Sequence, residues 1–68
     1  MKQVSGKDLI RTLERNGWRL MRIQGSHHIY GKVGEPLRIS VPVHGSHPLK
    51  PGILKHFMKI AGLDESDF

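Results

Sequence analysis

The chain turns at Gly25-Ser26-His27-His28-Ile29-Tyr30, close to the middle of its 68 residues. This glycine–serine step can turn sharply, and the β-branched and aromatic side chains after it are typical of a strand. The two histidines are therefore expected at the start of a strand, where an imidazole is exposed. An exposed imidazole titrates near neutral pH and can accept or donate a proton.

Strands are predicted on both sides of this turn. From Trp18 the sequence alternates with period two, which predicts a first strand with Trp18 and Leu20 on one side. The opposite side of that strand is predicted to carry Arg19, Met21 and Ile23. Residues 28–32 form the predicted second strand, and residues 34–36 form the predicted turn into a third.

The third strand, residues 37–43, has the clearest alternation. Its apolar side, which is expected to face the core, holds Leu37, Ile39, Val41 and Val43. Its polar side, which is expected to face solvent, holds Arg38, Ser40, Pro42 and His44. Proline lacks an N–H, so Pro42 indicates a strand that lies at a sheet edge or has stopped pairing there.

A helix is predicted before the strands and another after them. Ser5 and Asp8 have the spacing of a capping box, and Asn16-Gly17 ends the first helix. The second starts near Pro51 and ends at Gly62, and its apolar stripe is Ile53, Leu54, Phe57, Ile60 and Ala61. After it, Asp64 and Asp67 are spaced to cap a short further turn.

This order predicts a single α+β domain over residues 1–68, arranged α-β-β-β-α. Each strand has one apolar side, so both helices are expected on the same face of a three-stranded antiparallel sheet.

The chain has no cysteine, so disulfides and thiolate metal sites are excluded. No apolar run reaches the roughly 18 residues of a membrane span, and the first four residues lack the apolar stretch of a signal peptide. A cytoplasmic protein without a membrane partner is expected.

Charge is distributed unevenly along the chain. Three of the six acidic residues lie in the last five positions, so residues 1–63 hold eleven basic and three acidic residues, a net charge of +8. Such density favours a polyanionic partner, most simply nucleic acid. The alternative is an ordinary soluble basic surface.

In order and spacing, the chain resembles the HicA family of toxins from toxin–antitoxin pairs. The resemblance rests on the helix at residues 5–13, on Gly17-Trp18, and on the segments at residues 25–30, 41–45, 49–54 and 61–63, with a terminal Phe68. It implies a fold like the double-stranded-RNA-binding domain, cleavage of messenger RNA that arrests translation and growth, and inhibition by a HicB-type antitoxin. In that family the functional residue is the histidine after the glycine–serine step, which corresponds here to His27. Periodicity alone does not choose His27 over His28.

A metal-independent ribonuclease needs a base for the ribose 2′-hydroxyl, an acid for the leaving 5′-oxygen, and cations for the phosphorane charge. We expect His27 to be the general base or acid. The RNA-binding candidates are Arg22, Ser26, His28, Lys32 and Arg38. Ser26 is alternatively a turn residue that satisfies its own backbone, and Tyr30 either stacks on a base or packs across strands on the open face.

No metal site is expected, because the histidines lack the spaced Cys or Cys/His pattern of structural zinc. His44, His47 and His56 are interpreted as loop and helix-surface residues. No cofactor is expected.

Two other functions compete with the ribonuclease. One is a non-catalytic module that binds RNA and acts by occlusion, and the other is a protein that serves chiefly as one half of a complex with an acidic antitoxin.

Overall fold

Two helices and three strands follow one another in the predicted order. The computed structural model describes residues 3–68, with α1 at Gly6–Arg15, β1 at Arg19–Gln24, β2 at His27–Lys32, β3 at Glu35–Pro42 and α2 at Pro51–Ala61. A short 3₁₀ turn, η1, covers Glu65–Asp67. Met1 and Lys2, part of the segment that lacks the pattern of a signal peptide, lie outside the described residues.

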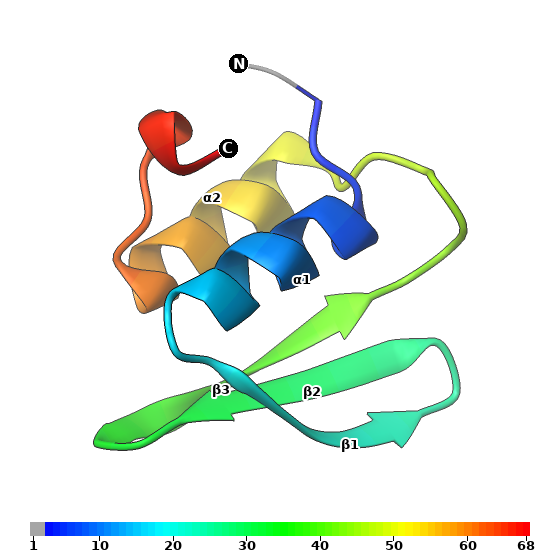
Figure 1. Cartoon of the computed structure of the whole chain (residues 1–68). Helices are drawn as coiled ribbons and strands as arrows, with labels where there is room; N and C mark the ends of the chain where they lie inside the picture. The colour runs from blue at the N-terminus through cyan, green and yellow to red at the C-terminus, as the bar shows by residue number, and fades with distance from the viewer. Residues whose placement is uncertain (1–2) are drawn as a thin grey trace.

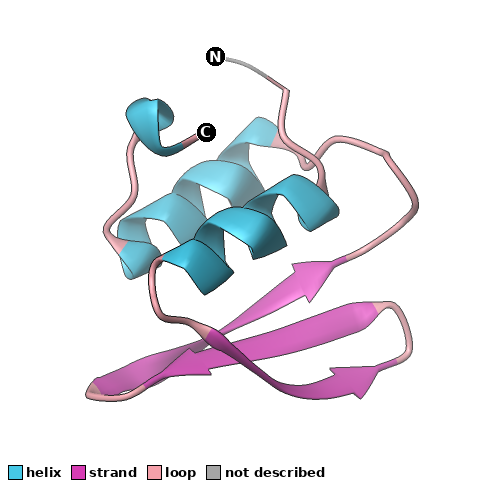
Figure 2. Cartoon of the chain, in the orientation of Figure 1, coloured by secondary structure: helices cyan, strands magenta, loops and turns pink. Residues whose placement is uncertain are grey.

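The strands form one antiparallel sheet in the order β1-β2-β3, and both helices lie over the same face of it (Figure 1). Figure 2 shows the two layers, with helices above and strands below. The opposite face of the sheet is covered by no element of residues 3–68. The predicted α+β fold is confirmed, and β3 is an edge strand that ends at Pro42, as its missing N–H indicated.

Both capping boxes occur as the spacing predicted. The Ser5 hydroxyl accepts a hydrogen bond from the Asp8 N–H at 3.2 Å, and the Asp8 carboxylate accepts one from the Ser5 N–H at 3.1 Å. This pair satisfies two of the N–H groups that the start of a helix leaves without partners. Asp64 and Asp67 form the same arrangement at η1, so these acids belong to a helix start.

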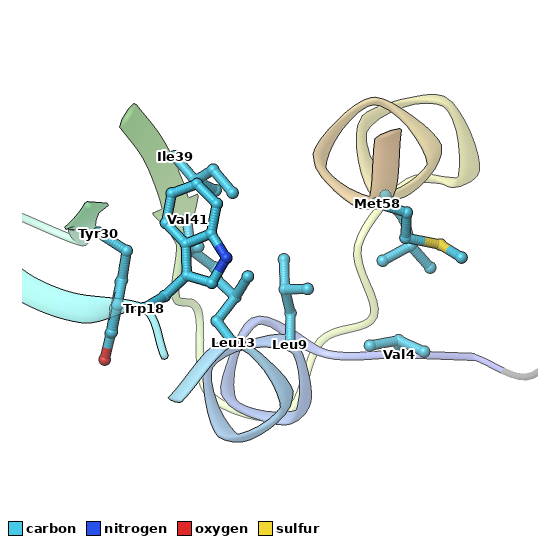
Figure 3. Close-up of a cluster of buried hydrophobic side chains, with 9 residues drawn as sticks. Val4, Leu9, Leu13, Trp18, Tyr30, Ile39, Val41 and Met58 are labelled. Carbon is cyan, nitrogen blue, oxygen red and sulfur yellow. The ribbon is translucent and has the colours of Figure 1, made fainter. Parts of the chain in front are cut away.

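The core lies between the helices and the β2–β3 half of the sheet. Figure 3 shows Leu9 and Leu13 of α1 lying between the sheet residues Ile39 and Val41 on one side and Met58 of α2 on the other. The buried apolar residues are Val4, Leu9, Leu13, Trp18, Tyr30, Ile39, Val41, Leu54 and Met58. None of them comes from β1, whose six residues are all exposed. The helices pack chiefly over β3, so β1 extends beyond their cover.

Several details of the predicted strands are wrong. Glu35 and Pro36 belong to β3 rather than to the turn, β2 begins at His27, and Val43 follows β3. Leu37, expected in the core, is 53% exposed, because it lies at the end of the β2–β3 hairpin near a shift in register.

The first strand also differs from a simple alternation. The β1–β2 register shifts between Leu20 and Arg22, so Leu20 pairs with Tyr30 and Ile23 with His28. Residues paired across strands share a face, so Leu20 and Ile23 lie on the same side of the sheet instead of on opposite sides.

None of the helices in residues 3–68 has the length and hydropathy needed to cross a membrane.

Candidate active site on the open face of the sheet

The turn at Gly25-Ser26 places His27 at the first position of β2. Gly25 has a φ of +58°, which glycine adopts at no steric cost and which suits the first central position of a two-residue hairpin. The turn closes with Gln24 paired to His27. The chain after β3 also braces it, because the Val43 N–H donates to the Ser26 carbonyl at 2.8 Å.

His27 lies on the face of the sheet that points away from the helices. Tyr30 is buried on the helix side, and side chains alternate along a strand, so His27 and Ile29 point to the open face. Ile29 pairs with Arg22 on β1 and with Ser40 on β3, which puts these two residues on the open face as well. The open face therefore brings the candidate catalytic histidine together with an arginine and a serine.

Ser40 holds the His27 ring. The side chain of His27 is exposed, and its Nδ1 lies 3.1 Å from the Ser40 hydroxyl oxygen. Either atom can donate in this hydrogen bond, depending on the tautomer of the imidazole. In both tautomers Nε2, on the opposite side of the ring, is left to exchange a proton with a bound molecule. A ring fixed through one nitrogen is the usual arrangement for a histidine that transfers protons through the other.

Arg38 lies toward the other end of the open face, whereas Lys32 shares the helix side with Tyr30 by alternation, and its Cε would lie 3.4 Å from a Cβ added at Gly17. The Arg38 side chain crosses Gly31, where an added Cβ would come within 3.0 Å of its Cδ and Nε, and Arg38 Nη1 donates to the Glu35 carbonyl at 3.3 Å. Lys32 lines a shallow hollow with Arg38. At about 3.3 Å per residue, Lys32 is about 16 Å from His27 along β2. The two cations therefore lie at the end of the sheet away from His27.

The structure separates His28 from His27. His28 pairs with Ile23 and Val41 and points to the helix side, where it lines a hollow with Lys7 and Arg11. The two neighbouring histidines therefore serve different surfaces.

Tyr30 also faces the helices and is buried. Both predictions for it, stacking on a base and packing across strands on the open face, are therefore wrong. Its hydroxyl donates to Glu14 Oε2 at 3.0 Å. Burial raises the pKa of Tyr30 to about 12, and the hydrogen bond to the Glu14 carboxylate and its negative charge add to the effect.

Acidic residues lie away from His27. Five of the six belong to α1 or to the C-terminal segment around η1, and the sixth, Glu35, begins β3 at the end opposite His27. Among residues 3–68 no three histidine or acidic side chains are grouped closely enough to hold a metal ion. Near His27 the open face carries the Ser40 hydroxyl and the Arg22 side chain.

One residue near His27 was missed by the sequence reasoning. His56, interpreted as a helix-surface residue, lines a groove together with His27 and Ser40. Its position on the exposed side of α2 was readable from the sequence, but no local signal indicates that α2 approaches the open edge of β3.

The fold and the site define a class of protein: a small α+β domain with a basic, uncovered sheet face that carries a histidine. Within that class, the chain belongs to the HicA toxin family, because the family model described as the HicA toxin of bacterial toxin–antitoxin systems matches residues 6–63. No curated protein matches the chain. Membership implies a toxin of a toxin–antitoxin pair and an antitoxin partner of the HicB type.

Proposed function

We propose that this toxin is a metal-independent endoribonuclease that cleaves messenger RNA, with His27 as a proton-transfer residue. The observation that carries the proposal is the exposed His27 imidazole, fixed through Nδ1 by Ser40 on a basic face with acidic residues held elsewhere. Removal of messages would arrest translation and growth, which fits the toxin family.

The proposed reaction is a displacement at phosphorus in which the RNA supplies its own nucleophile. The ribose 2′-oxygen attacks the adjacent phosphorus while the bond from phosphorus to the 5′-oxygen breaks. The products are a 2′,3′-cyclic phosphate and a 5′-hydroxyl, and two protons move, one from the 2′-hydroxyl and one to the 5′-oxygen. An imidazole suits either transfer, because its ring nitrogen can accept a proton or donate one.

Nearby cations would bind the RNA backbone. Arg22, two positions from His27 across the β1–β2 ladder, would bind the reacting phosphate, and its guanidinium would stabilise the added negative charge. Arg38 and Lys32 would bind phosphates further along the strand and set its register. Ser26 lies at the turn beside His27, whereas His28 would meet RNA only if a strand passed over the helix side.

The antitoxin would inhibit by covering this face. The open face is basic, so an acidic partner surface complements it and competes directly with the phosphates of RNA. Cytoplasmic action is part of the proposal, since messenger RNA and the antitoxin are both found there.

The test is cleavage of a defined RNA by purified protein in the presence of EDTA. His27→Ala should reduce the rate by roughly 10²- to 10⁴-fold, the usual contribution of one proton-transfer residue, and should abolish growth arrest. His47→Ala is the matched control, because it removes an exposed imidazole from the loop after β3. Undiminished cleavage by His27→Ala would refute the assignment.

Two further outcomes separate the competing functions. Growth arrest by a protein that never cleaves RNA would support the non-catalytic module that acts by occlusion. A 2′-deoxyribose at the cleaved position should stop the reaction, because it removes the nucleophile, and persistent cutting would rule out the 2′-hydroxyl mechanism.

A further inference from the structure

The candidate site continues from the open face into a groove at the edge of the sheet. β3 is the edge strand beside α2 (Figure 1), and the groove lies between them. Its lining residues are His27, Ser40 and Pro42 from the sheet and Gly52, Ile53, His56 and Phe57 from α2. Its volume of about 320 Å³ lies at the lower end of the range of small-ligand sites, about 300–1,000 Å³.

The groove has a histidine on each side. His27 enters it from the start of β2, and His56 enters it from the second turn of α2. Side chains on a helix point back toward its N-terminus, so His56 extends over the turn that contains Gly52. An added Cβ at Gly52 would meet no atom within 4 Å, which leaves the space in front of His56 open.

The His56 ring lies beside the ring of Phe57. The two ring centroids are 5.9 Å apart with a tilt of 47° between the planes. The sheet side of the groove presents to His56 the His27 imidazole and the Ser40 hydroxyl, and it carries no carboxylate. On α2 the charged neighbours of His56 in sequence are Lys55 and Lys59. His56 is thus a second imidazole beside a space that is open to a phosphodiester.

We propose that His56 is the second proton-transfer residue of the ribonuclease, so that His27 and His56 divide the two proton transfers between them. The inference rests on the proposed function and deepens it. In an in-line displacement the attacking 2′-oxygen and the leaving 5′-oxygen lie on opposite sides of the phosphorus. One imidazole on an open face reaches one of these oxygens, whereas imidazoles on the two sides of a groove reach both.

The protons balance over the reaction. One histidine, neutral at the start, accepts the proton of the 2′-hydroxyl as the new bond to phosphorus forms. The other, protonated at the start, donates its proton to the 5′-oxygen as that bond breaks. The enzyme then holds one proton on the opposite histidine, and exchange with water restores the starting state. The geometry does not depend on which histidine takes which role.

The first experiment compares His56→Ala with the wild type and with His47→Ala on a defined RNA in EDTA. His56→Ala should lower the cleavage rate by roughly 10²- to 10⁴-fold, and His47→Ala should leave it unchanged. His56 is exposed, so a thermal melt should show both variants folded. If His56→Ala melts early, His56→Gln replaces it, because glutamine keeps polar bulk on α2 but transfers no proton.

The second experiment uses the same RNA with sulfur in place of the 5′-bridging oxygen at the cleaved position. A thiolate leaves without help from an acid, because thiols have a pKa of about 8.5. One of His27→Ala and His56→Ala, and only one, should then recover to within roughly tenfold of the wild-type rate, and the recovered variant identifies the general acid.

The outcomes separate this inference from the proposed function. If His27→Ala is inactive while His56→Ala cleaves at the wild-type rate, the second histidine is refuted and the ribonuclease stands. Recovery of neither variant, or of both, on the sulfur substrate also overturns the division of roles. If the wild type does not cleave RNA, the proposed function fails and the inference fails with it.

Discussion

The Tyr30→Phe substitution should lower stability without changing cleavage. Tyr30 is 2% exposed and lies on the helix side of the sheet, where its hydroxyl donates to Glu14 Oε2 at 3.0 Å. Phenylalanine keeps the ring and removes only this hydrogen bond. The candidate site lies on the opposite face, so the chemistry at His27 should not be affected.

The size of the effect follows from the acceptor. A hydrogen bond to a charged group contributes roughly 1.5–3 kcal/mol when both partners are protected from water. Glu14 is exposed, so its carboxylate regains water when the hydroxyl is lost. We therefore expect a loss of about 1 kcal/mol, which in a domain of this size lowers the melting temperature by roughly 4–8 °C.

The pH dependence gives an independent measurement. The folded-state pKa of Tyr30, about 12, is above the unfolded value of about 10, because burial and the Glu14 carboxylate disfavour the phenolate. The stability that the neutral Tyr30 hydroxyl contributes is fully present below about pH 10 and is lost as the pH rises toward about 12. The advantage of the wild type over Tyr30→Phe should therefore shrink across that interval.

The assay is direct, because Tyr30 is the only tyrosine in the chain. Phenolate absorbance should appear with a midpoint near 12 in the folded protein and near 10 in denaturant. A midpoint near 10 in the folded state, or an unchanged melting temperature for Tyr30→Phe, would show that the hydroxyl is not buried against Glu14. A large loss of cleavage by a folded Tyr30→Phe would contradict the assignment of the site to the open face.

Three further substitutions test the helix start and the open face. The hydrogen bond from the Ser5 N–H lowers the pKa of the Asp8 carboxyl in the folded protein. The ionised carboxylate therefore stabilises the fold above the unfolded pKa, and this stabilisation is lost as the pH falls through the folded pKa. Asp8→Asn should lower the free energy of unfolding, measured in urea at pH 7, by roughly 0.3–1 kcal/mol, and the difference from the wild type should vanish in acid. Gly6→Ala would put a methyl group against the last carbonyl of β3 and should cost roughly 1–3 kcal/mol, measured by thermal melting. Gly31→Ala should push Arg38 aside and lower the salt dependence of single-stranded RNA binding by about 0.7 in log–log slope, and an unchanged slope would show that Arg38 binds no phosphate.

The sequence specified the elements whose signals are local. Both capping boxes, the glycine that ends α2 and the edge position of β3 follow from a few neighbouring residues, and the structure confirms each. Such signals act within one turn of helix or one strand end, so no knowledge of the tertiary structure is needed to interpret them.

Which face a strand residue occupies was harder to predict. Alternation placed Leu20 and Ile23 on opposite sides, but the register shift between them puts both on the helix side. Alternation also placed Leu37 in the core, although Leu37 is 53% exposed at the end of the β2–β3 hairpin. A bulge and the extent of helix cover both depend on the partner elements, which a single-strand pattern does not contain.

The same limit applies to the candidate site. The resemblance chose His27 over His28, and the strand geometry supplies a physical difference between them, because neighbouring strand residues point to opposite faces. His56 is 29 positions further along the chain, and only the packing of α2 beside β3 puts it in the same groove. Local patterns cannot place residues of two distant elements together.

Chain length explains why such a site lies at an edge. A domain of this size buries only about 60% of its unfolded surface, so its small core fills one face of the sheet and leaves no enclosed cavity for a reaction. Side chains from two elements can then surround an open space only at the boundary between the helix layer and the sheet. In this fold that space is the groove between β3 and α2. If the proposed ribonuclease acts there, a long flexible strand of RNA would reach the site from solvent, and an antitoxin would close it by covering the edge of one face.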